Sequence, residues 1–164
     1  MGGLTHPSPN FGERREGAGP SIVVIHYTAM ESSAAALDRL RDPGSEVSAH
    51  YLIDYSGEVM SLVAEEMRAW HAGVGAWGEV EDVNSHSIGI ELQNTGAEPF
   101  PEPQMVALQG LLAGILGRWA ISPAHVIGHS DCAPGRKVDP GPRFDWARLA
   151  RLGLATVDRR PPKG

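Results

Sequence analysis

The chain has 164 residues, of which 41% are hydrophobic and 21% charged, a composition typical of one globular domain. Its formal net charge is −6 and its lysines and arginines are scattered, which argues against a nucleic-acid partner. Cys132 is the single cysteine, so an intrachain disulfide is excluded.

The start of the chain has neither the apolar stretch of a signal peptide nor a cysteine for lipid attachment. We expect residues 1–20 to form a flexible lead, residues 21–152 the folded domain and residues 153–164 a C-terminal tail. No segment approaches the ~18–20 apolar residues that span a bilayer, so we expect no membrane segment.

The first half of the domain combines strand and helix patterns. Residues 21–27 form a β-branched run typical of a strand buried on both faces, and residues 32–41 are rich in alanine and leucine, which favours a helix. Residues 47–54 and 58–63 flank a Tyr-Ser-Gly turn and predict a β-hairpin. Residues 67–84 lack a period and predict a loop with a helical turn.

The second half alternates strands with helices. Residues 86–94 alternate in polarity as a strand does, and residues 102–120 carry the apolar stripe of a helix. A short strand over 125–129 and a closing helix that begins near Asp145 follow. The pattern predicts an α/β fold, a single domain with a mixed β-sheet flanked by helices.

Two histidines end buried strands, where the sheet of an α/β protein opens towards its ligand-binding loops. These are His26 and His129, and a stiff loop rich in proline and glycine follows the second. Catalytic zinc sites use three ligands from histidine and carboxylate, with water in the fourth position. From spacing alone, the third ligand is Asp131, Asp139 or His50.

Two further charged residues suit hydrolysis of an amide. Glu91 lies on the polar face of its predicted strand, next to Gly89, which leaves space beside it. A carboxylate there could act as general base for an attacking water. Lys137 precedes Asp139 by two residues and could face the oxyanion that forms when water attacks a carbonyl.

Five blocks carry a resemblance that extends over nearly the whole domain. In chain order they read VIHYTA, VSAHYLI, AWHAGV, NSHSIGIELQN and GHSDCAPGRKVDPGP. In these blocks the chain resembles the zinc-dependent N-acetylmuramoyl-L-alanine amidases of the AmpD/AmiD type. The resemblance implies a mixed sheet flanked by helices, with the zinc site in a groove at one face of the sheet.

Carried over position by position, the resemblance implies one Zn2+ per chain, held by His26, His129 and Asp139. It assigns Glu91 as the catalytic acid and base and Lys137 as the stabilising cation. The same resemblance suggests Trp70, His71, Asn84 and Arg136 as groove residues that contact substrate. It suggests His50 as a residue that orients a metal ligand or its water.

The function implied is cleavage of the amide between N-acetylmuramic acid, or its 1,6-anhydro form, and L-alanine of the stem peptide. The partners would then be peptidoglycan fragments or muropeptides, in bacterial cell-wall degradation or recycling. The alternative is a non-catalytic peptidoglycan-binding module, which would usually lack a zinc ligand or the catalytic pair. We expect a cytoplasmic location, or a periplasmic one if a leader preceded this chain.

Overall fold

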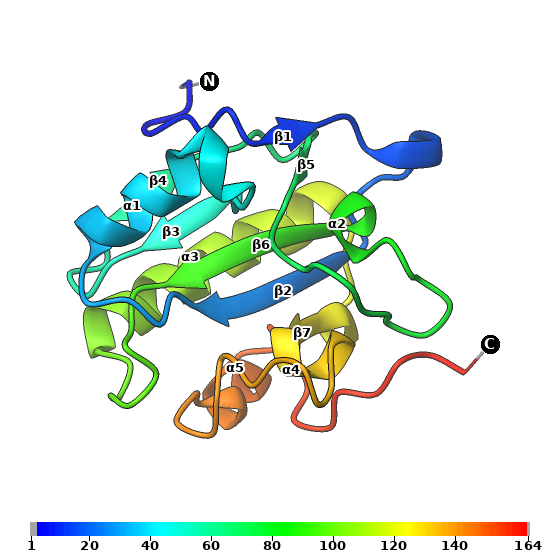
Figure 1. The fold of residues 1–164 in the computed structure, drawn as a ribbon. Coiled ribbons are helices and arrows are strands. Elements are labelled where there is room, and N and C mark those ends of the chain that lie inside the picture. The colour runs from blue at the N-terminus through cyan, green and yellow to red at the C-terminus, as the bar shows by residue number, and fades with distance from the viewer. Residues whose placement is uncertain (1–2, 164) are drawn as a thin grey trace.

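Five strands make the central sheet of the computed structural model, which describes residues 3–163 (Figure 1). Their order across the sheet is β4-β3-β6-β2-β7, in which β3 and β4 are antiparallel and the other neighbours are parallel. The strands are β2 (Ile22–Tyr27), β3 (Tyr51–Ile53), β4 (Val59–Ser61), β6 (Ser87–Leu92) and β7 (Val126–Gly128). The predicted mixed sheet and the predicted hairpin are both confirmed.

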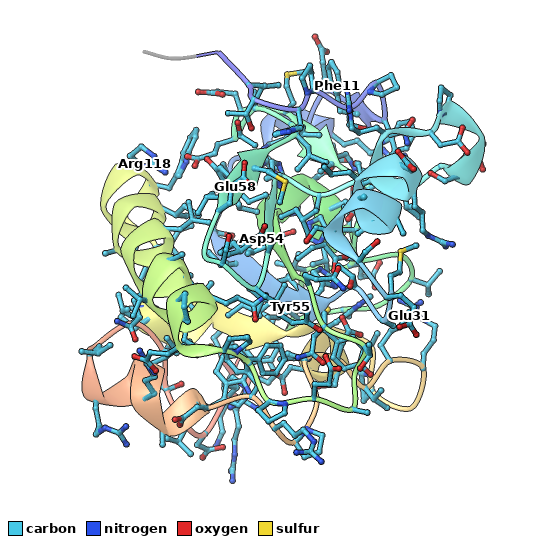
Figure 2. All side chains as sticks on the ribbon, turned by 90° about the vertical axis from the view of Figure 1, so that its left-hand side faces the viewer. Phe11, Glu31, Asp54, Tyr55, Glu58 and Arg118 are labelled. Atoms are coloured by element: carbon cyan, nitrogen blue, oxygen red, sulfur yellow. The ribbon has the colours of Figure 1, made fainter. Side chains whose placement is uncertain are left out.

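Helices cover both faces of this sheet. They are α1 (Ser33–Arg41), α2 (Val83–His86), α3 (Glu102–Trp119), α4 (His129–Cys132) and α5 (Trp146–Arg151), with short 3-10 helices at Arg15–Gly17, Pro43–Ser45 and Pro123–His125. Figure 2 shows α3 and α1 on opposite sides of the sheet. The sheet therefore separates two layers. One lies between the sheet and α3 and holds the main core, and the other lies between the sheet and α1.

The alternation of β2 assigns its side chains to the two layers. Val23 and Ile25 belong to the main apolar core, which they share with α3 and α5. Ile22 and Val24 belong to a second cluster with Trp77 on the other face. Since side chains two apart along a strand share a face, His26 lies on the face away from α3. Strand β2 therefore presents His26 to the α1 layer, next to the apolar Ile22 and Val24.

The lead of the chain is held against the domain, which differs from the flexible segment that the sequence predicts. Residues Phe11–Gly12 form strand β1, which pairs with β5 (Arg68–Ala69) in a small second sheet. Asn10 is buried, and its Nδ2 donates to the carbonyl of Val47 at 2.8 Å. The guanidinium of Arg14 donates to several backbone carbonyls around α2. Such polar contacts with a distant backbone leave no mark in local sequence.

The tail also packs on the domain. Arg159 pairs with Asp131, with Nε 2.8 Å from Oδ2, and its guanidinium lies 3.7 Å from the centroid of the Trp146 ring. Ala155 is buried. Among residues 3–163, no helix combines the length and the apolar character that crossing a membrane requires.

Candidate metal centre and pocket

Three buried side chains bring one potential ligand atom each to a common point. The Nδ1 atoms of His26 and His129 are 3.0 Å apart. Asp139 Oδ2 lies 3.0 Å from His26 Nδ1 and 3.3 Å from His129 Nδ1. Of the three candidates that spacing left open for the third position, the structure therefore brings Asp139 to the two histidines.

Strand order and loop geometry bring these residues together. His26 lies near the carboxyl end of β2, and His129 directly follows β7, its parallel neighbour. His129 begins helix α4 and so does not end a strand as the sequence predicts. The loop after α4 folds back, with the Ser130 amide donating to the Asp139 carbonyl at 3.0 Å. This return explains the stiff composition of the loop.

The Nε2 atoms of both histidines, which lie on the side of the ring away from the common point, also have contact partners. His129 Nε2 lies 2.8 Å from the carbonyl oxygen of Ala72, and His26 Nε2 lies 3.0 Å from His71 Nδ1. Because a carbonyl only accepts, His129 Nε2 carries the hydrogen and leaves the Nδ1 lone pair for a cation. His26 has the same form if its Nε2–H donates to His71.

The protonation states favour metal binding. Burial opposes charge on Asp139, but hydrogen bonds from His129 and His26 outweigh it and hold the pKa of this carboxyl well below its usual range. Burial lowers the pKa of His26. At neutral pH the site thus offers a carboxylate and a neutral imidazole, the forms that bind metal.

The donor set fits a catalytic zinc ion. Two imidazole nitrogens and one carboxylate oxygen form the kind of three-ligand set that catalytic zinc sites use, in which water takes the fourth position. Cys132 is buried and its Sγ donates to the carbonyl of His129 at 3.4 Å, so its thiol is already engaged outside the ligand set. The chemistry of the residues present therefore agrees with zinc.

Glu91 stands beside His26 on the same face of the sheet. The two residues are register partners on the parallel strands β6 and β2. The Oε2 atom of Glu91 is buried and has no hydrogen-bond partner among residues 3–163. Burial, and then the negative charge of Asp139, raise the pKa of Glu91 well above its ordinary value. The carboxyl group thus holds a proton more tightly than an ordinary glutamate does, as suits a general acid and base.

A pocket of about 380 Å³ opens over this cluster. Besides the three potential ligands and Glu91, its lining includes Lys137, Trp70 and His71, all of them predicted site residues. Helix α1 contributes Arg39, which the sequence reasoning missed. An arginine on the exposed face of an amphipathic helix is so common that no local signal could have marked it.

Two predicted substrate residues lie outside the pocket lining and bind backbone. Asn84 is buried, and its Oδ1 accepts the amide hydrogens of His71 at 3.1 Å and Ala72 at 2.8 Å. Arg136 donates from Nη2 to the carbonyls of Ala72 and Val74, both at 2.7 Å. Both side chains therefore hold the segment that contains His71, and their contact with substrate stays a prediction.

The contacts of His50 differ from prediction, whereas His71 lies in the pocket lining and also against a potential ligand. The two ring nitrogens of His50 contact the amide of Gly89 at 3.0 Å and the carbonyl of Met67 at 2.9 Å, and burial lowers its pKa to about 4. It makes no hydrogen bond to a potential ligand in the described chain. His71 instead contacts His26, and its ring fills the space over Gly89, where a Cβ would lie 2.5 Å from His71 Cγ. That glycine is the one sequence signal for this packing.

Comparison with known proteins places these features in a family. Residues 16–142 match the family described as N-acetylmuramoyl-L-alanine amidase. The chain is 41% identical over 151 residues to the N-acetylmuramoyl-L-alanine amidase AmiD of Escherichia coli, covering 81% of this chain and 53% of AmiD. It is 35% identical over 170 residues to the 1,6-anhydro-N-acetylmuramyl-L-alanine amidase AmpD of Enterobacter cloacae, covering 93% of this chain and 91% of AmpD. The chain thus spans about half of AmiD and most of AmpD.

Solved structures agree with the fold. A crystal structure of an AmpD derivative superposes with a TM-score of 0.82 at 34% identity, over 92% of either chain. AmiD from E. coli in complex with the substrate anhydro-N-acetylmuramic acid-L-Ala-D-gamma-Glu-L-Lys gives 0.78 at 37% identity, over 90% of this chain and 67% of that one. At these identities the likeness extends beyond the fold alone.

Proposed function

The chain belongs to the N-acetylmuramoyl-L-alanine amidase family, and we propose that its pocket hydrolyses the amide between muramic acid and L-alanine. The muramic acid is N-acetylated and either ordinary or in its 1,6-anhydro form, so the partners are muropeptides or peptidoglycan fragments. The observation that carries the proposal is the convergence of three potential zinc ligands beside an unpartnered glutamate, in one pocket. The AmpD-type resemblance favours the cytoplasm as the location.

One zinc ion per chain would be held by His26, His129 and Asp139. The chemistry that zinc supplies in such a site is a water activated near neutral pH and a polarised carbonyl. Glu91 takes a proton from the attacking water and passes it to the leaving nitrogen of L-alanine. Its raised pKa suits this exchange, because an ordinary glutamate holds a proton too weakly at neutral pH.

Lys137 lines the pocket from the loop that also carries Asp139. We expect Lys137→Met to lower kcat by about 10²- to 10³-fold, because one cation that faces the developing oxyanion is lost. The bound zinc should remain, so metal content and kcat measured on the same sample test the assignment. An unchanged kcat at full metal content would remove Lys137 from the mechanism.

Arg39 supplies a second cation to the pocket, and its side chain forms no ion pair with residues 3–163. The peptide in the AmiD complex contains a γ-linked D-glutamate, whose α-carboxylate is therefore free. We expect Arg39→Gln to raise KM for such a peptide by about 10- to 150-fold, since a charge-assisted hydrogen bond of about 1.5–3 kcal/mol is lost.

Two controls test the role of Arg39, a modified substrate and a variant of a neighbouring arginine. The same peptide with that carboxylate amidated should show no change between wild type and variant. Arg41 lies on the same helix, and its Nε donates to the carbonyl of Pro7 at 3.2 Å, outside the pocket lining. Arg41→Gln should leave KM unchanged. Equal increases for both peptides would contradict carboxylate recognition.

The activity itself is tested on purified protein of verified zinc content. Hydrolysis of 1,6-anhydro-N-acetylmuramyl-tripeptide is compared with that of intact peptidoglycan sacculi, with and without a chelator. Chelator-sensitive release of peptide from the anhydro substrate supports the proposal, and cleavage of both substrates broadens it. No cleavage of either by zinc-loaded protein would favour a binding module instead.

A further inference from the structure

We propose that the segment His71–Ala72 positions the metal-binding histidines, and that His71 and Asn84 are positioning residues that contact no substrate. The inference deepens the proposed function, since it concerns the same zinc site. It also reverses the expectation drawn from the resemblance, in which both residues contact substrate.

Two consecutive residues contact the Nε2 atoms of His26 and His129. His71 Nδ1 lies 3.0 Å from His26 Nε2, and the Ala72 carbonyl lies 2.8 Å from His129 Nε2. Hydrogen bonds at these nitrogens fix the tautomer and the ring orientation of a metal-binding histidine. A single backbone step therefore sets the direction of two of the three ligand atoms.

His71 is itself fixed in place. Its second nitrogen, Nε2, lies 3.0 Å from the hydroxyl of the buried Ser87, and its ring packs over Gly89. If Nε2–H donates to that hydroxyl, Nδ1 is left to accept the hydrogen of His26 Nε2. Turning the ring towards a substrate would break both contacts, although one edge of the ring lines the pocket.

The backbone of the segment is held from two sides. Asn84 Oδ1 accepts both of its amide hydrogens, and Arg136 Nη2 donates to its Ala72 carbonyl. Arg14 in turn donates to the carbonyl of Asn84 at 3.2 Å. Side chains from the lead, from α2 and from the metal-binding loop thus fix one short segment. Loss of the Asn84 oxygen would free two amides beside the metal centre.

The test is a zinc titration of metal-free protein against a chromophoric chelator. His71→Leu removes the acceptor for His26, whereas His71→Asn keeps a side-chain oxygen near the position of Nδ1. We expect the zinc Kd of His71→Leu to rise about 10- to 100-fold and that of His71→Asn to recover most of the loss. The absorption spectrum of bound Co2+ should change in His71→Leu, because the ligand geometry changes.

Asn84 provides a second matched pair. Asn84→Ala should raise the zinc Kd, whereas Asn84→Asp keeps an oxygen for both amides and should bind zinc nearly as wild type does. With zinc saturating, KM for the muropeptide should stay within about twofold in all four variants. A residue that contacts the substrate would instead raise KM when it is replaced. Circular dichroism of the metal-free proteins checks that each variant folds.

The opposite pattern would overturn the inference. Unchanged zinc affinity and Co2+ spectrum together with a raised KM would make His71 and Asn84 substrate contacts. A wild-type protein that binds zinc but cleaves no muropeptide would overturn the proposed function instead. The zinc titration would then still decide the positioning role, since its readout requires no turnover.

Discussion

Replacing Glu91 by glutamine should lower kcat by about 10²- to 10⁴-fold while zinc stays bound, because a general base is lost and no ligand is touched. The carboxyl group sits beside His26 in the register of β2 and β6, within the same pocket. Glutamine keeps the shape of the side chain but cannot accept the proton of the attacking water. Measuring kcat and zinc content on one preparation separates this effect from metal loss.

Glu91→Ala provides the comparison. It should lose turnover to a similar extent and also keep its zinc, since Glu91 lies outside the three-atom cluster. Full activity in either variant would show that another group takes the proton, and the assignment of roles in this pocket would be wrong. Loss of zinc from the glutamine variant would instead place Glu91 among the groups that support the metal.

Glu91→Gln should also stabilise the metal-free protein at high pH. Because the pKa of Glu91 is raised above its ordinary value of 4.5, the folded protein binds more protons than the unfolded chain just above pH 4.5. The stability of the wild type therefore falls as pH rises through this range, and glutamine does not titrate. Unfolding in urea with a chelator should show the glutamine variant to be more stable than the wild type at pH 8, and this difference should disappear below pH 4.5.

The periodic elements of the fold could be predicted because their signal is local. The β-branched run of β2, the alternation of β6 and the apolar stripe of α3 each follow from contacts with one or two layers. The path of a loop has no such period. Asp131 accepts the Gly128 amide at 2.8 Å and Asp139 reaches the histidines, yet spacing alone left both as candidate ligands.

The supporting residues of the site could not be separated from its substrate contacts for a related reason. Asn84 and Arg136 act on backbone amides and carbonyls of a segment far away in sequence, and backbone groups are the same for every residue type. Which histidine, His50 or His71, contacts a potential metal ligand depends on which ring packs over Gly89. Tertiary packing decides this, and the local sequence does not show it. The juxtaposition of His26 and Glu91, which strand register sets, was therefore predictable from local pattern, whereas the backbone contacts of Asn84 and Arg136 were not.

Removing one ligand should abolish both zinc binding and turnover. We expect His129→Ala and Asp139→Asn to weaken zinc binding by roughly 10²- to 10³-fold, because ~10–16 kcal/mol of zinc affinity is shared among about four ligands. At a zinc concentration that saturates the wild type, both variants should lack metal and show background activity. Prolonged treatment of the wild type with a chelator should reproduce the loss, and added zinc should restore activity to that protein alone.

Asp131→Asn is the matched control for Asp139→Asn. Asp131 lies eight positions earlier on the same segment, yet its carboxylate accepts from the Gly128 amide and pairs with Arg159, so its loss removes an ion pair and no ligand. This variant should unfold at a lower temperature and still bind zinc and cleave substrate. If Asp131→Asn lost zinc while Asp139→Asn retained it, the return of the loop would not define the metal centre. The two carboxylates would then exchange the roles that the geometry gives them.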